Sequence, residues 1–295
     1  MAARRGGFLR FIRRLTFAIA LLLVAAGAYI YSIGAWNLVF PSTAHDERPP
    51  YLPGDLRSPA VLVFSKTNGF RHEEGIAAGT VTLDSIGIGR GWDMFFTENG
   101  AVFNDEQLSN FAAVVFLNAS GDMLSVIQEQ SFERWLENGG GWLGIHAAGD
   151  GSQQDWRWYM DTLIGANFTA HILDPQFQIA SVVTENVDHP AVQALPSVWD
   201  HEDEWYSFDR SPRASGFTIL ATVDEDSYSP IQKLPWKETD LRMGDHPIAW
   251  STCVGSGRAM YTALGHSKKA FDNPVFKTLL GDALAWLLGE PSAGC

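Results

Sequence analysis

Cysteine is almost absent from this sequence, which contains only Cys253 and Cys295 among its 295 residues. Two cysteines cannot build the disulfide framework that stabilises many small secreted domains. Cys253 lies in an apolar run typical of a strand, so we expect a small buried side chain there. Cys295 is the last residue, where we expect a mobile chain, and neither position favours a catalytic thiol.

Basic residues are also scarce. The chain has 21 lysines and arginines against 34 aspartates and glutamates, and its formal net charge is -13. Five of the positive charges are arginines within residues 1–14, so the rest of the chain carries -18. Because such a body repels phosphate backbones, the composition argues against a nucleic-acid partner.

Only one apolar run is long enough to cross a membrane. It extends without a charge from Leu15 to Ile33, and nineteen helical residues nearly match a hydrocarbon core of about 30 Å. Arginines precede it and no basic residue directly follows, which predicts a cytoplasmic N-terminus. We therefore expect a basic tail at 1–14, a single-pass transmembrane anchor at 15–36 and an extracytoplasmic domain, periplasmic in a Gram-negative bacterium.

A cleaved signal peptide is the alternative for this run. Ala26-Gly27-Ala28 supplies the small residues that a signal peptidase accepts, and Arg13-Arg14 has part of a twin-arginine motif. The apolar run continues past the small residues and is long for a signal peptide. Tyr29 and Tyr31 would suit the membrane interface, so the uncleaved anchor is our preferred interpretation.

Residues 37–59 predict an extended tether. They carry mixed charges, no apolar period and a series of prolines: Pro41, Pro49, Pro50, Pro53 and Pro59. We expect one folded domain from 60 to 290.

The pattern of that domain predicts an α/β fold. Apolar runs alternate with helical stretches, which favours a mostly parallel, flavodoxin-like sheet with helices on both faces. After Ala170, short apolar runs separated by turns indicate an antiparallel or mixed extension of the sheet. The expected strands lie at 60–66, 92–99, 112–120, 141–146, 177–183, 217–223, 246–254 and 258–265. One expected helix follows the first strand and ends near Ile88, and two others span 126–140 and 273–289.

Ligands of open parallel sheets bind beyond the carboxyl ends of the strands. His72 follows the first expected strand, and His146 follows the fourth within Gly139–Ala148. Glycine and alanine around His146 allow a sharp turn that would project its imidazole from the strand end, toward the crevice that His72 faces.

Five motifs in this order closely resemble the ThuA-like (trehalose utilisation) family, across roughly Ala60 to Gly289. They are GGGWLGIHAA, HP, DEWYSF, DHPIAW and GRAMYTALGH. That family is similar in fold to class I glutamine amidotransferases, in which a strand-to-helix elbow presents a nucleophile. Because His146 occupies the elbow and no cysteine does, the resemblance does not imply amidotransferase or thiol-protease chemistry.

The resemblance implies carbohydrate metabolism, with an oxidised, keto-glycoside-like sugar derivative as substrate. Hydrolase, isomerase and lyase reactions all remain open, since each needs a proton shuttle and a polarised carbonyl. We assign catalytic roles to His146, His171, Glu204 and His266, and substrate binding to His72, Trp142, Trp205 and Tyr206.

A divalent metal, zinc or manganese, would suit a ligand set of His146, His171 and Glu204. No HExxH or CxxC spacing is present, so metal-free acid–base catalysis stays equally open. His201 and Glu202 lie in an acidic run and are expected to be solvated. A noncatalytic carbohydrate- or partner-binding module is the alternative function, because a fold does not prove an activity.

Overall fold

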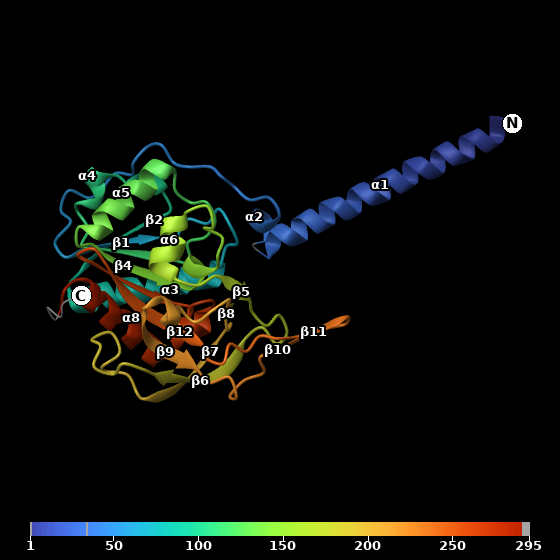
Figure 1. The fold of residues 1–295 in the computed structure, drawn as a ribbon. Helices are drawn as coiled ribbons and strands as arrows, with labels where there is room; N and C mark the ends of the chain where they lie inside the picture. Colours follow the sequence, from blue (N-terminus) through green and yellow to red (C-terminus); the bar gives the residue numbers. More distant parts are fainter. Residues whose placement is uncertain (1, 34, 291–295) are drawn as a thin grey trace.

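A nine-stranded sheet forms the centre of the computed structural model, which describes residues 2–33 and 35–290 (Figure 1). Its strand order is β2-β1-β3-β4-β13-β12-β9-β6-β7. The half from β2 to β13 is parallel, in the order typical of flavodoxin-like folds. Its strands are β1 (Ala60–Phe64), β2 (Asp93–Thr97), β3 (Ala113–Leu117), β4 (Gly141–Ile145) and β13 (Gly257–Thr262). The α/β prediction is confirmed.

The other half of the sheet is antiparallel, as predicted for the region after Ala170. Its strands are β12 (Pro247–Val254), β9 (Thr218–Val223), β6 (Gln178–Thr184) and β7 (Val198–Asp203). Buried and accessible side chains alternate along much of β6 and β7, which therefore bury one face. The burial predicted for Cys253 is wrong: it is exposed near the end of β12. Cys295 lies outside the described residues.

Helices cover both faces of the sheet (Figure 1). One face carries α3 (Glu73–Arg90), α7 (Lys268–Asp272) and α8 (Pro274–Leu287), and the other carries α4 (Asp105–Leu108), α5 (Val126–Glu137) and α6 (Arg157–Tyr159). The closing helix α8, expected at 273–289, buries an apolar face that includes Leu279, Leu280 and Leu287 against the sheet. Asn273 caps it by accepting hydrogen bonds from the backbone N–H groups of Val275 and Phe276.

Shorter elements lie in the segments that connect these strands and helices. They are the helical turns η1 (Gly100–Val102), η2 (His146–Gly149), η3 (Met160–Ile164) and η4 (Pro212–Ser215), the pair β5 (Phe168–Ala170) and β8 (Ser207–Phe208), and the hairpin β10 (Ile231–Leu234) and β11 (Lys237–Asp240).

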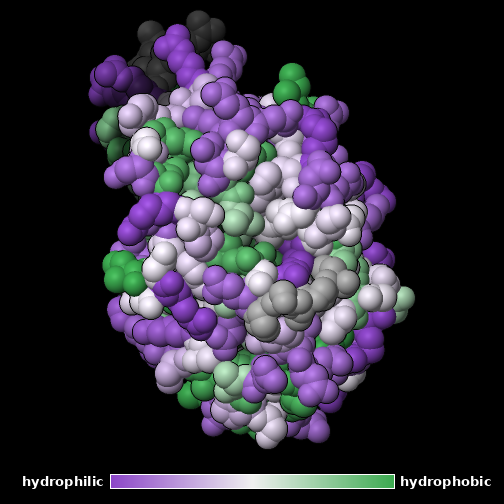
Figure 2. Space-filling view, turned by 90° about the vertical axis from the view of Figure 1, so that its left-hand side faces the viewer, coloured by the Kyte–Doolittle hydropathy of each residue, from purple (hydrophilic) through white to green (hydrophobic). Residues whose placement is uncertain are grey.

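The N-terminal helix α1 (Ala2–Ser32) projects away from the domain (Figure 1). Its segment Arg10–Ser32 is long and apolar enough to cross a membrane, and none of its most apolar part is buried in the domain. The short helix α2 (Trp36–Val39) follows it. The face opposite α1 is mostly hydrophilic, with hydrophobic residues in small groups (Figure 2).

Residues 40–59 contain no helix or strand, yet they lie along the domain. The carboxylate of Asp46 accepts hydrogen bonds from Lys66 Nζ at 2.6 Å and from the Gly100 backbone N–H at 2.9 Å. Further along, Gln107 Nε2 donates to the Pro50 carbonyl at 2.7 Å. The segment is therefore an extended strap fastened to the domain surface.

Candidate functional site

A sharp turn at the end of β4 places His146 at the centre of the site. His146 adopts a positive φ of 51°, a left-handed conformation that is uncommon for residues other than glycine. The glycines beside it leave room for two large rings: a Cβ on Gly144 would lie 2.4 Å from the Trp142 ring, and one on Gly149 would lie 2.4 Å from the Tyr261 ring. Close packing under the turn thus requires glycine at both positions.

Hydrogen bonds orient the His146 imidazole. Its Nδ1 lies 2.7 Å from the carbonyl oxygen of Ala263, which can only accept, so Nδ1 carries a proton. In the neutral ring, Nε2 then offers its lone pair to the other side. Tyr261 donates its hydroxyl proton to the His146 carbonyl at 2.8 Å, which holds the backbone of the turn. His146 itself is fully buried.

Asp203, at the end of β7, positions two further site residues. Its carboxylate accepts hydrogen bonds from the backbone N–H groups of Gly265 (2.7 Å), Glu204 (2.9 Å) and His266 (3.2 Å). Burial alone would raise the pKa of Asp203, but the hydrogen bond and charge of His201 lower it below the ordinary value. An ionised, buried carboxylate therefore joins the two loops that carry Glu204 and His266.

His201 corrects one expectation. Its side chain is buried and lies 3.2 Å from Asp203, whereas the acidic run predicted a solvated residue. The alternation of β7 turns His201 and Asp203 inward together. Glu202 is half-buried and pairs with Lys269 at 2.8 Å.

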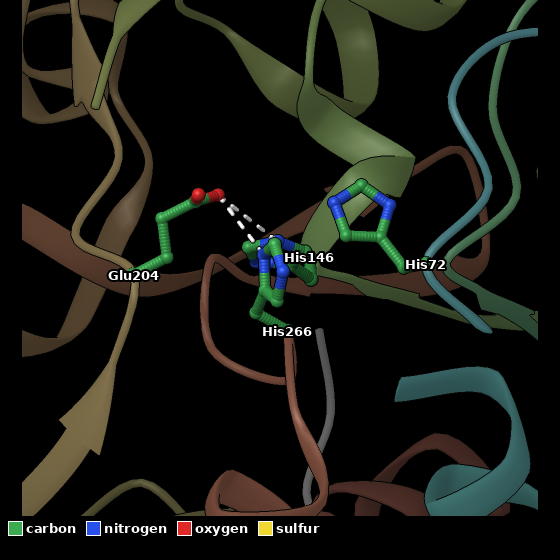
Figure 3. Close-up of side chains that lie close together, drawn as sticks. All are labelled: His72, His146, Glu204 and His266. Atoms are coloured by element: carbon green, nitrogen blue, oxygen red, sulfur yellow. Dashed lines mark hydrogen bonds and ion pairs between the residues drawn. The ribbon is translucent and has the colours of Figure 1, made fainter. Parts of the chain in front are cut away.

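Four side chains converge at the carboxyl ends of the parallel strands: His72, His146, Glu204 and His266 (Figure 3). One possible ligand atom from each lies within 4.8 Å of the others. His146 Nε2 is 3.0 Å from His266 Nδ1 and 3.6 Å from Glu204 Oε2, and the last two atoms are 3.1 Å apart. In Figure 3, His146 and His266 lie between Glu204 and His72.

His72 precedes α3 without capping it through its side chain. Its imidazole lies edge-to-face against those of His146 and His266, with ring centroids 4.8 and 4.6 Å away. Its buried Nδ1 has no hydrogen-bond partner among the described residues. Burial, reinforced by the charges of His146 and His266, holds the pKa of His72 well below its ordinary value, so this ring is neutral.

The carboxylate of Glu204 remains ionised although it is buried. Burial alone would raise the pKa of Glu204, but hydrogen bonds with His146, His171 and His266 hold it far below the usual range. Gln176 Nε2 donates to Oε1 at 2.6 Å, and His171 Nδ1 lies 3.0 Å from the same oxygen. Burial lowers the pKa of His171, but the hydrogen bond to Glu204, the charge of Glu204 and the hydrogen bond to the Ile172 carbonyl together raise it above its ordinary value.

The cluster differs from the predicted ligand set in the side chains that it brings together. His171 lies beside the Glu204 oxygen that faces away from the cluster, and His72 and His266 join His146 and Glu204 in its place. The sequence does not show that His72 and His266 take the place of His171. The packing of separate loops decides which histidine ring lies beside each oxygen of Glu204.

A cavity of about 690 Å³ opens above the cluster. Its lining includes five of the predicted residues: His72, His171, Glu204, Tyr206 and His266. Burial and then the charge of Glu204 raise the pKa of Tyr206 well above its ordinary value, so the phenol is neutral.

Two predicted substrate-binding aromatics do not reach the cavity. Trp142 is fully buried, and its ring packs against Phe116 and Tyr159 in the core. Trp205 donates from Nε1 to the Gln178 carbonyl at 2.9 Å and is buried as well. Phe70 and Phe168 line the cavity instead.

Sequence reasoning missed several other residues at the site. Asp150 lines the cavity, and burial raises its pKa to about 6. Asn118 follows β3, accepts from the Ala147 backbone N–H at 3.3 Å and donates to the Gly265 carbonyl at 3.0 Å. Its place directly after a buried strand was a usable signal. The cavity wall formed by Asn37–Thr43 had no such signal.

The fold and the site define an α/β protein with a histidine–carboxylate cluster at the carboxyl ends of a flavodoxin-like sheet. A family model described as trehalose utilisation (ThuA) matches residues 60–287, and the chain belongs to this family. No curated protein matches the sequence.

Solved structures share this fold. A ThuA-like protein of Bacteroides uniformis is 23% identical, with a TM-score of 0.68 over 83% of this chain and 98% of its own. A ThuA-like protein of Parabacteroides merdae is 19% identical, with a TM-score of 0.60 over 79% and 90% of the two chains. A cytoplasmic protein of Salmonella typhimurium is 11% identical, with a TM-score of 0.54 over 77% and 99%.

Proposed function

We propose that this chain is a membrane-anchored, extracytoplasmic enzyme that transforms a sugar-derived, keto-glycoside-like substrate. The observation that carries the proposal is the convergence of His72, His146, Glu204 and His266 below a cavity. Three imidazoles and an ionised carboxylate are costly to bury together unless they bind a ligand or exchange protons. The family description, trehalose utilisation, supports a sugar as the substrate.

The cluster has the donors that a divalent metal such as zinc or manganese requires. The Nδ1 proton of His146 leaves Nε2 free to ligate, His72 is neutral, and Glu204 is ionised. Ligands on a tetrahedral ion with bonds of about 2.0–2.1 Å lie about 3.3 Å apart. The separations of 3.0, 3.1 and 3.6 Å among His146, His266 and Glu204 fit this spacing. A bound metal would polarise a substrate carbonyl.

The surrounding residues can orient the substrate and move protons. Tyr206 offers a neutral phenol and an aromatic face for a sugar ring. Asp150, with a pKa of about 6, can accept or donate a proton near neutral pH. The raised pKa of His171 lets it donate a proton beside Glu204. These groups suit hydrolysis, isomerisation or elimination of a keto-glycoside, with or without a metal.

The N-terminus supports the proposed location. A tail with arginines precedes the candidate span Arg10–Ser32. The short helix α2 follows the span and leads into the domain. By the positive-inside rule, the tail stays in the cytoplasm and the domain lies outside, in the periplasm of a Gram-negative cell.

Metal analysis of the purified full chain in detergent tests the proposal, with His146→Ala and the control His189→Ala, whose half-buried ring lies outside the cluster. We expect near-stoichiometric zinc or manganese in the wild type and control, and at least a tenfold loss in His146→Ala. Turnover of keto-glycosides should disappear in the same variant.

Two results would contradict this function. Unchanged turnover in His146→Ala would remove His146 from the catalytic centre. Sugar binding without turnover, in a folded wild-type protein supplied with zinc or manganese, would identify a noncatalytic binding module instead.

A further inference from the structure

Exposed apolar side chains surround the mouth of the cavity. On one side, Leu38 of α2 lines the cavity and is 66% exposed, and Phe40 beyond it is also exposed. On the other side, the loop 171–177 contributes His171 and Gln176 to the cavity and presents Leu173 and Phe177 outward, 57% and 39% exposed. Apolar side chains gathered around a polar cavity indicate a surface that meets another apolar phase.

The hairpin β10–β11 extends this rim. Trp236, in its turn, is 80% exposed, and exposed lysines lie on either side at Lys233 and Lys237. Among the described residues, neither lysine forms an ion pair. At the base of the hairpin, Gln232 Oε1 accepts a hydrogen bond from the Leu173 backbone N–H at 2.5 Å, which joins the hairpin to the cavity loop.

The rim lies close to the membrane if α1 spans it. Figure 1 shows the hairpin β10–β11 projecting from the side of the domain that α1 leaves. Four residues lie between Ser32, the last residue of α1, and Asn37 in the cavity wall, which makes five Cα-to-Cα steps. Such a segment reaches at most about 18 Å when fully extended. The opposite face of the molecule is mostly hydrophilic (Figure 2).

We propose that the rim of the cavity docks on the outer surface of the bilayer, with Leu38, Phe40, Phe177 and Trp236 in the headgroup layer. A tryptophan between lysines suits that layer, since the ring enters the interface and the ammonium groups meet lipid phosphates. The cavity then opens toward lipids, and its substrates are sugars attached to a lipid. This substrate class rests on the proposed function.

Tryptophan quenching in proteoliposomes tests the docking. The vesicles contain phosphatidylcholine and phosphatidylglycerol, with or without bromine on shallow acyl carbons. The helix α1 contains no tryptophan, and of the tryptophans in the described residues only Trp36 and Trp236 are exposed. We therefore expect lipid quenching of the full chain to fall by about half in Trp236→Phe, and to stay unchanged in the control Trp158→Phe, on α6.

The docking is refuted if Trp236→Phe leaves lipid quenching unchanged and instead removes quenching by aqueous iodide. The metal content of each variant is measured in the same preparations. Loss of lipid quenching in Trp236→Phe, with the metal content of the wild type, supports docking. A wild-type protein that does not turn over keto-glycosides would contradict the enzyme proposal and leave this quenching result unchanged, so the two failures can be told apart.

Discussion

Asp203 organises the site without lining the cavity. Its carboxylate accepts backbone hydrogen bonds from Gly265, Glu204 and His266, so two loops far apart in sequence share one buried anion. A neutral amide at this position could not accept all three bonds, because its NH₂ group would face a backbone N–H. The geometry of the cluster therefore depends on a charge that lies outside the cavity.

Asp203→Asn should lower the stability of the domain by about 1–3 kcal/mol, the usual penalty for an unsatisfied buried donor. It should also weaken metal binding by about 10–100-fold, as expected for a residue that positions ligands. Thermal unfolding and metal titration of the full chain in detergent measure both effects.

Asp200→Asn is the matched control, because Asp200 is exposed on the same strand. It should change stability by less than about 0.5 kcal/mol. Equal unfolding midpoints for the two variants would show that Asp203 does not brace the loops.

The strand β4 and the turn η2 act together as the element that presents His146. Trp142 and Tyr261 fill the space beside the strand, and the missing side chain of Gly144 lets both rings approach. Trp142 thus supports the turn from inside the core. Its ring does not line the cavity, where the predicted substrate-binding role would place it.

Gly144→Ala should destabilise the domain by about 1–3 kcal/mol, since the added Cβ would lie 2.4 Å from the Trp142 ring and 3.1 Å from the Tyr261 ring, both immobilised by burial. Gly89→Ala is the opposite control: it lies near the end of α3 with nothing within 4 Å of the new Cβ. We expect it to stabilise by up to about 1 kcal/mol. Thermal unfolding checks the pair, and the packing argument fails if Gly144→Ala is as stable as wild type.

At the scale of the whole molecule, the strap connects the candidate span to the cavity. The segment from α2 to Thr43 forms part of the cavity wall, and Asp46 fastens the chain that follows it. Removing everything before Ala60 would therefore open the site.

Tags at the two ends of the chain test the topology in a Gram-negative host. We expect protease added to spheroplasts to remove a C-terminal tag, and an N-terminal tag to resist until the membrane is lysed, because the arginines keep it inside. Both tags should stay on one polypeptide of full length. An N-terminal tag missing from the mature chain would instead identify a cleaved signal peptide at Ala26-Gly27-Ala28.

The sequence by itself determined the features that depend on local pattern. Buried strands such as β1 and β3 are continuous apolar runs, the closing helix has an apolar face, and the candidate span contains a long uncharged run that begins at Leu15. The turn at His146 was visible because glycine and alanine crowd the end of a buried strand. These signals are local because the spacing of apolar residues and the conformational freedom of glycine can be read from a few neighbouring residues.

Only the tertiary structure decided which polar residues meet. His72 follows β1 in the parallel half of the sheet, and Glu204 follows β7 in the antiparallel half. The successive reversals of direction between β13 and β7 point the carboxyl end of β7 toward the same end of the sheet as the parallel strands, where the two residues meet. Whether His171 or His72 joins the cluster depends on the direction of each side chain, which loop packing sets. Aromatic residues look alike in sequence, yet Trp142 fills the core while Tyr206 lines the cavity, since the pleat of a strand and the space around it assign each ring its side.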